Sequence, residues 1–151
     1  MSSGMVAEPP STSKLELIRE FLRLNGTQAE IDSGSFLHRH ALPGGALVPL
    51  VPGPAPNPVP AMQAAIEALE AAYHPHRRVW QEEYEEHVNW EFTERELQAL
   101  VNFLESDVGR HFLEGRWRMN AYVGTNTEPL VEQIVAAAQE SLALGAHPTQ
   151  K

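Results

Sequence analysis

Residues 92–113, FTERELQALVNFLESDVGRHFL, predict two consecutive helices and decide the fold class. Apolar side chains recur in this stretch every three or four residues, as they do on one face of a helix. Thr93 and Glu96 come just before them, at the spacing of a capping box. Ser106 and Asp107 are suited to cap the helix that follows. The apolar face of the first helix carries Leu97, Leu100, Val101 and Leu104.

Helical periodicity continues on both sides of this stretch. Ser13 and Glu16 predict a second capping box, at the start of the N-terminal helix that ends at Asn25-Gly26. Downstream, Gly124 and Pro129 are expected to interrupt the helix, and a separate last helix is expected to follow and to end at Gly145. No alternating strand pattern of useful length is present, so the sequence predicts an all-α fold, a compact bundle of about six to seven short helices. The helices expected upstream cover Ser13 to the stop at Asn25-Gly26, residues 27–41 with an interruption at Ser33-Gly34-Ser35, residues 62–73 and residues 75–90.

Proline and glycine mark out the domain organisation. Residues 43–60 hold seven of the twelve prolines, and these remove backbone donors, so a long extended connector is predicted within the bundle. The first residues are small, polar and proline-containing, which predicts a flexible leader over residues 1–12. A single helical domain is expected over residues 13–145, and a flexible tail over residues 146–151.

The composition of the 151 residues excludes several classes of protein. A formal net charge of -9 argues against nucleic-acid binding, because phosphate recognition needs clustered Lys and Arg. The absence of cysteine excludes disulfides and thiolate zinc sites. No apolar run approaches the roughly 20 residues that span a bilayer, and the N-terminus lacks the pattern of a signal peptide. No membrane insertion is therefore expected, and the chain as written is expected to be cytoplasmic.

An acidic run on the predicted helix 75–90 is the leading candidate site. Its carboxylates, with a tryptophan at the helix end, are expected to hold a basic protein partner. The structural alternative is a solvated helix face, or pairing with the arginines at positions 110, 116 and 118. Most other aromatic side chains are expected in the core, where rings at helical spacing are usually found. The predicted partner-binding residues are Glu82, Glu83, Glu85, Glu86 and Trp90.

Histidines and glutamates in the same region support a second hypothesis, a metal- or small-ligand-binding helical protein. Glu83 and His87 have the i, i+4 spacing that points two side chains to the same side of a helix. The Glu-x-x-His repeat of carboxylate-bridged bundles and the His-Glu-x-x-His motif are both absent, and no catalytic constellation is recognised, so an enzyme is not predicted. No cofactor is expected. The candidate metal ligands are His74, His76, Glu83 and His87.

Residues 92–113 also resemble the signature of the bacterial domain-of-unknown-function family 2059. That signature reads Phe-Thr-x-x-Glu-Leu, an apolar pair, Phe-Tyr-x-Ser-Pro-x-Gly and a basic residue. Two positions differ, since Leu104 stands where the family has tyrosine and Asp107 where it has proline. The resemblance covers residues 73–140 and the helix from Leu15 to Gly26. The matching positions are Phe92, Thr93, Glu96, Leu97, Leu100, Phe103, Ser106, Gly109 and Arg110.

The family resemblance implies a compact helical domain of unsettled function, in proteins that are generally exported. It therefore implies a periplasmic location if the chain is a trimmed mature form. Taken with the charge asymmetry, the residues favour a non-enzymatic protein-interaction module. The metal- or small-ligand-binding protein is the alternative. Substitution separates the two, because His74 and His76 belong to the second hypothesis and the carboxylates of residues 82–86 chiefly to the first.

Overall fold

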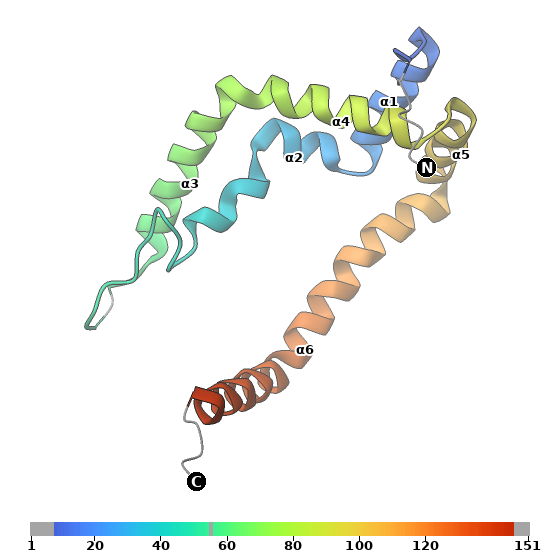
Figure 1. Cartoon of the computed structure of the whole chain (residues 1–151). Coiled ribbons are helices and arrows are strands. Elements are labelled where there is room, and N and C mark those ends of the chain that lie inside the picture. Colours follow the sequence, from blue (N-terminus) through green and yellow to red (C-terminus); the bar gives the residue numbers. More distant parts are fainter. Residues whose placement is uncertain (1–7, 55, 147–151) are drawn as a thin grey trace. The chain divides into compact units, whose positions relative to one another are not determined.

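The computed structural model describes residues 8–54 and 56–146, and all regular structure in these residues is helical (Figure 1). This confirms the all-α prediction. The predicted flexible leader falls largely on residues 1–7 and the predicted tail on residues 147–151, which lie outside the described residues. The elements are α1 (Thr12–Leu24), α2 (Thr27–Ser33), η1 (Ser35–Ala41), α3 (Val59–Tyr73), η2 (His74–His76), α4 (Arg77–Glu91), α5 (Glu94–Glu105) and α6 (Asp107–Ala146), where η marks a 3-10 helix.

The chain divides into two units, Met1–Ser106 and Asp107–Lys151. The first unit contains α1 to α5 and both 3-10 helices, and the second contains α6. The expectation of a single helical domain over residues 13–145 stays a prediction. Among the helices of the described residues, none combines the length and apolar character that crossing a bilayer requires.

The N-cap of helix α1 lies two residues earlier than predicted, at Ser11 in place of Ser13. Its N-cap is Ser11, which has extended backbone angles (φ -61°, ψ 162°) and whose Oγ accepts a hydrogen bond from the Lys14 N–H at 3.2 Å. Ser13 therefore lies inside the helix, and the predicted capping box of Ser13 and Glu16 is wrong. The physical reason is that an equally good capping residue precedes Ser13 and already satisfies the first turn.

Helix α5 begins at the capping box that the sequence predicts. The Glu96 N–H donates to Thr93 Oγ1 at 3.1 Å, and the Thr93 N–H donates to Glu96 Oε1 at 3.0 Å. The hydrogen bond from the Thr93 N–H holds the pKa of Glu96 below its usual value, because it favours the charged carboxylate. The start of α5 is thus fixed by reciprocal hydrogen bonds between its N-cap residue and its third residue.

Two glycines allow the turns between α1, α2 and η1. Gly26 has φ +87° and Gly34 has φ +71°, in the left-handed region that favours glycine. A Cβ added at Gly34 would also lie 2.5 Å from Tyr73 Cδ1, which is too close for two carbon atoms. Both the stop at Gly26 and the interruption at Gly34 confirm the prediction from sequence.

The buried apolar side chains of the first unit form two separate clusters. One joins α1, α4 and α5, and the other joins η1, α3 and part of the proline-rich segment. Fully burying one such side chain stabilises the fold by about 1.5–3 kcal/mol. The first cluster contains Ile18, Leu22, Val88 and Leu97, with Leu17, Phe21 and Phe92 packed against it. The second contains Ala41, Val48 and Ala65, with Met62, Ile66 and Leu69.

Three aromatic rings join η1 to the junction of α3 and α4. Tyr73 packs edge-on against Phe36 and Trp80, with ring centroids 5.4 Å and 5.3 Å apart. Tyr73 is 4% exposed, and this burial raises the pKa of its phenol. Its hydroxyl donates to the Ile31 carbonyl oxygen at 2.5 Å, so the buried polar group is satisfied.

The beginning of the proline-rich segment is folded, which corrects the prediction of an extended connector over residues 43–60. The Gly44 N–H donates to the Val48 carbonyl at 2.8 Å. Val48 is 8% exposed and packs with Ala41 and Ala65. An apolar side chain within reach of α3 thus outweighs the tendency of the surrounding prolines to extend. Residues 49–54 and 56–58 are exposed and contain neither helix nor strand.

Helix α6 continues through Gly124 and Pro129, so the predicted break before a separate last helix is wrong. Inside a helix, glycine costs about 1 kcal/mol and proline about 3 kcal/mol relative to alanine. The Thr127 hydroxyl donates to the Val123 carbonyl at 2.6 Å, one turn before the proline. The carbonyl that loses its donor at Pro129 is that of Thr125, four residues earlier, so the Thr127 bond does not replace the missing hydrogen bond. Bonds of this kind to the preceding turn often bend a helix.

Candidate functional site

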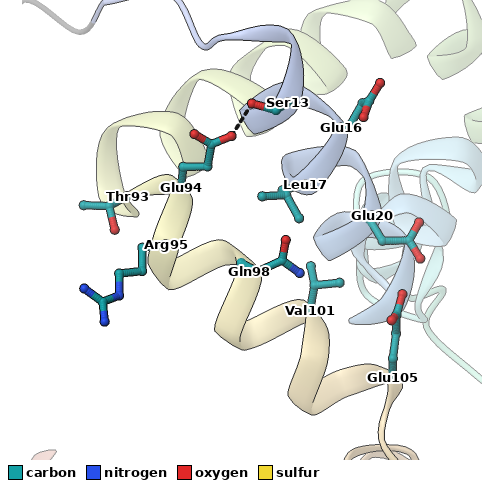
Figure 2. Close-up of a pocket in the computed structure, with 10 residues that line it drawn as sticks. All are labelled: Ser13, Glu16, Leu17, Glu20, Thr93, Glu94, Arg95, Gln98, Val101 and Glu105. Carbon is teal, nitrogen blue, oxygen red and sulfur yellow. Dashed lines mark hydrogen bonds between the residues drawn. The ribbon is translucent and has the colours of Figure 1, made fainter.

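An open groove of about 980 Å³ lies between α1 and α5 within the first unit (Figure 2). Its floor is apolar, since Leu17 projects from α1 and Val101, which is 4% exposed, projects from α5. Carboxylates from both helices stand at its rim. We call this site the α1–α5 groove. Its lining residues are Ser13, Glu16, Leu17, Glu20, Thr93, Glu94, Arg95, Gln98, Val101 and Glu105.

The rim of the α1–α5 groove is strongly acidic, with four glutamates and one arginine. Glu20 Oε2 accepts a hydrogen bond from Arg23 Nε at 3.1 Å, and this contact holds the pKa of Glu20 below its usual value. The Ser13 hydroxyl donates to Glu94. Figure 2 shows Glu105 of α5 extending toward Glu20 of α1. The groove therefore presents negative charge around an apolar floor.

The core packing of the first unit positions these side chains. Ile18 of α1 and Leu97 of α5 are both fully buried in the same cluster, which fixes the two helices side by side. Glu16 and Glu20 then lie one turn apart on the accessible side of α1. The α1–α5 groove is not among the sites predicted from the sequence. Two glutamates at i, i+4 spacing were a visible signal, but the α5 residues that complete the site are about 80 positions away, as the contact of Ser13 with Glu94 shows.

Trp90, which the sequence analysis singled out, lines a smaller cleft of about 370 Å³. The ring is 40% exposed and lies edge-on to His87, with centroids 4.8 Å apart. The chain's own residues Glu8 to Pro10 lie at this cleft, where Asn89 Nδ2 donates to the Glu8 carbonyl at 2.9 Å. We call this site the Trp90 cleft. Its lining residues are Glu8, Pro9, Pro10, Leu15, Glu82, Glu85, Glu86, Asn89 and Trp90.

Four of the five predicted partner-binding residues thus meet at the Trp90 cleft, and Glu83 does not line it. Two of the four predicted glutamates, Glu82 and Glu85, pair with an arginine of the first unit, and Glu83 lies beside His87. Exposed pairs with arginine contribute about 0–1 kcal/mol to stability, but they reduce the charge offered to a partner. The pairs are Arg78 Nε–Glu82 Oε1 at 2.8 Å, His87 Nε2–Glu83 Oε2 at 3.3 Å and Arg19 Nε–Glu85 Oε2 at 3.2 Å.

The four predicted metal ligands are brought together in part. Glu83 and His87 are neighbours on α4, as their spacing predicts. His74 and His76 lie in η2 and are exposed. Over the described ranges, no three histidine, aspartate or glutamate side chains converge on a point where a metal ion could sit. The metal-binding alternative therefore stays a prediction that a titration has to test.

Several aromatic side chains are exposed, although their helical spacing predicts most of them in the core. Trp80 and Phe92 are half-buried. Helical spacing shows which side chains share a face, but it does not show that another element covers that face. The prediction that most of these rings are buried was wrong for this reason. The exposed rings are Tyr84 at 39%, Trp90 at 40%, Phe103 at 43%, Phe112 at 53%, Trp117 at 68% and Tyr122 at 68%.

No family model, no curated protein and no solved structure matches this chain. The resemblance of residues 92–113 to the domain-of-unknown-function family 2059 therefore stays a prediction. What the α1–α5 groove can do chemically follows from its own residues. Carboxylates around an apolar floor bind cations that carry apolar surface, because ion pairs form at the rim while the floor excludes water.

Proposed function

We propose that the chain is a non-enzymatic protein-interaction module, and that its α1–α5 groove binds a basic amphipathic segment of a partner protein. The observation that carries this proposal is the combination of the apolar floor at Leu17 and Val101 with the surrounding glutamates. A helix with leucines on one face and lysines or arginines beside them matches both features. A small polar ligand would leave the floor uncovered.

The α1–α5 groove is a better candidate than the Trp90 cleft for two reasons. It is larger, at about 980 Å³ against about 370 Å³. It is also lined by two regular helices, whereas residues Glu8 to Pro10 already lie at the Trp90 cleft. Each site has glutamates that pair with an arginine of the chain itself, Glu20 at the groove and Glu82 and Glu85 at the cleft. A partner at the Trp90 cleft would have to displace contacts that the chain makes with itself.

The charge of the whole first unit supports a basic partner. Residues 1–106 contain fifteen Asp and Glu against seven Lys and Arg. A surface with this excess raises the encounter rate of positively charged segments, and it does so more strongly at low salt. The rim of the groove then selects among them, because a partner must place its cations beside Glu16 and Glu105 while its apolar face covers Leu17.

A fluorescent amphipathic helix of leucine and lysine tests the proposal by anisotropy. The double variant Glu16→Lys with Glu105→Lys is expected to weaken binding by about tenfold or more, which is about 1.4 kcal/mol. The matched control is Glu30→Lys with Glu67→Lys, which makes the same change of charge at exposed positions outside the groove. The control is expected to bind within about twofold of the unmodified chain, because a change of net charge alone acts weakly at a distance.

The proposal is wrong if the peptide does not bind, or if both double variants lose affinity equally. Equal loss would mean that net charge attracts the peptide and that no particular groove holds it. Reversal of Glu82 and Glu86 provides the comparison with the Trp90 cleft. Loss of binding in that variant, with the groove variant unchanged, would move the binding site to the surface that the sequence analysis favours.

A further inference from the structure

Helix α6 carries an exposed apolar strip from its first turn to its last. Six side chains on this strip are between 54% and 72% exposed. Their spacing places them within about a quarter turn of one another around the helix axis. The strip consists of Val108, Met119, Val123, Leu130, Ile134 and Leu144.

Helix α6 needs this strip to be covered. Four glycines and Pro129 give its 40 residues a poor intrinsic helix propensity. Helices of this kind are held mainly by burying an apolar face, and not by their own hydrogen bonds. With the neighbouring Tyr122, the strip exposes on the order of 700 Å². The largest apolar patch on a typical monomer is about 300–600 Å², whereas each partner of a standard interface contributes about 800 Å².

We propose that the apolar strip of α6 pairs with the same strip of a second copy, and that the two helices are antiparallel. This inference is independent of the α1–α5 groove, because it concerns residues of the second unit. The strip runs the length of a helix about 60 Å long, so one helix of equal length covers it fully. Two-fold symmetric dimers are also the commonest soluble homo-oligomers, and in an isologous pair the same strip of both copies is buried.

The distribution of charge along α6 sets the orientation. Its first part, residues 107–118, has three arginines against two carboxylates, and its remainder to residue 146 has three glutamates and no Lys or Arg. A parallel pair would place the two acidic parts against each other. An antiparallel pair places each arginine-containing part beside an acidic part. Arg116, Arg118 and Glu140 lie on or beside the strip. Arg110, Glu128 and Glu132 lie on the opposite side of α6 and contribute only to the net charge of each part.

Asn126 sets the register of the pair. It is a polar residue in the middle of the strip, on the face that also carries Val108 and Leu144. A single asparagine in an otherwise apolar seam favours the alignment in which it meets its own copy, because only that register satisfies its amide. Val108 and Leu144 lie 18 positions before and after Asn126, so an antiparallel pair centred there brings Val108 of one copy to Leu144 of the other.

The first test is the mass of the full chain in solution, measured by light scattering after gel filtration. A dimer is expected, and the double variant Met119→Glu with Leu130→Glu is expected to be monomeric. The control Thr125→Glu with Gln139→Glu adds the same charge on the opposite, polar side of α6 and is expected to remain dimeric. A monomeric unmodified chain at micromolar concentration would overturn the proposal, and so would a control that dissociates as completely as the strip variant.

Disulfide trapping gives a second test that does not depend on destabilising the helix. The chain has no cysteine, so each introduced thiol reports on one position. Under diamide, Asn126→Cys is expected to form a covalent dimer, and so is a mixture of Val108→Cys and Leu144→Cys chains. Neither Val108→Cys nor Leu144→Cys is expected to cross-link by itself. Self-cross-linking of Val108→Cys would mean a parallel pair, and no cross-linking at Asn126→Cys would mean that another surface covers α6. Either result overturns the proposal.

Discussion

The Tyr73 hydroxyl donates a hydrogen bond to the Ile31 carbonyl at 2.5 Å, between residues 42 positions apart in the sequence. This contact fastens the end of α3 to α2. It occurs because Gly34 has no side chain, which lets the Tyr73 ring lie against the backbone at the start of η1. A buried hydroxyl and a backbone carbonyl are thereby satisfied together, and the aromatic rings of Phe36 and Trp80 pack around them.

Gly34→Ala is expected to lower the free energy of unfolding by about 3 kcal/mol. Part of this cost is the left-handed backbone, and part is the overlap of the new Cβ with the Tyr73 ring. Gly26→Ala is the matched control, because Gly26 also has positive φ but has nothing within 4 Å of its added Cβ. It is expected to cost about 1 kcal/mol. Urea unfolding followed by circular dichroism measures both, and equal costs would show that the Tyr73 approach does not matter.

Ser11→Ala is expected to destabilise the first unit by about 1 kcal/mol, because it removes the acceptor for the Lys14 N–H. Ser13→Ala should cost less, since Ser13 lies inside α1 and makes an exposed contact with Glu94. The same unfolding experiment compares the two serines. A larger effect at Ser13 than at Ser11 would restore the capping box that the sequence first suggests.

Local signals in the sequence predicted local structure well. The Thr93–Glu96 capping box and the interruption around Gly34 depend on residues a few positions apart, and both are present. Helix α6 differs, since it continues through Gly124 and Pro129 although both residue types usually end a helix, and residue type alone does not reveal this. Val48 was missed for another reason: its burial depends on Ala65 of α3, whose position relative to the proline-rich segment only the fold determines.

The two candidate sites also differ in whether residues close together in the sequence are enough to predict them. The sequence singled out Trp90 and the glutamates near it, and four of those five residues do line one cleft because α4 is a single regular helix. The α1–α5 groove was not predictable in this way. Its two halves come from helices far apart in the chain, and only their shared burial at Ile18 and Leu97 brings Glu20 beside Glu105.

After prior chelation, added zinc, nickel or copper is expected to change the melting temperature by less than about 1 °C. An ion that binds only the native state would raise the melting temperature by mass action, so the absence of a rise means that no such ion binds. Glu83 and His87 supply two neighbouring groups, and the described residues hold no converging set of three. The double variant His74→Ala with His76→Ala is measured alongside. A rise of several degrees that this variant abolishes would establish the metal-binding alternative instead.

Acid should weaken the first unit through Asp32. Arg77 Nε donates to Asp32 Oδ1 at 2.9 Å, and this hydrogen bond holds the pKa of Asp32 below its usual value of 3.8. A carboxylate with a depressed pKa in the fold contributes stability that is fully present above 3.8 and is lost as the pH falls through the folded pKa. Asp32→Asn is therefore expected to lower the free energy of unfolding by about 0.5 kcal/mol at neutral pH, since the pair is half-exposed.

The difference between Asp32→Asn and the unmodified chain should shrink toward zero as the pH falls below 3.8 and through the folded pKa of Asp32, because protonation then removes from Asp32 the charge that the variant already lacks. Glu67→Gln is the control for the change in net charge, since Glu67 is exposed on α3. Unfolding curves in urea at a series of pH values give the comparison. A difference that persists unchanged into acid would mean that Asp32 acts through its shape and neutral hydrogen bonds, for example with Gln28, and that its charge beside Arg77 contributes nothing.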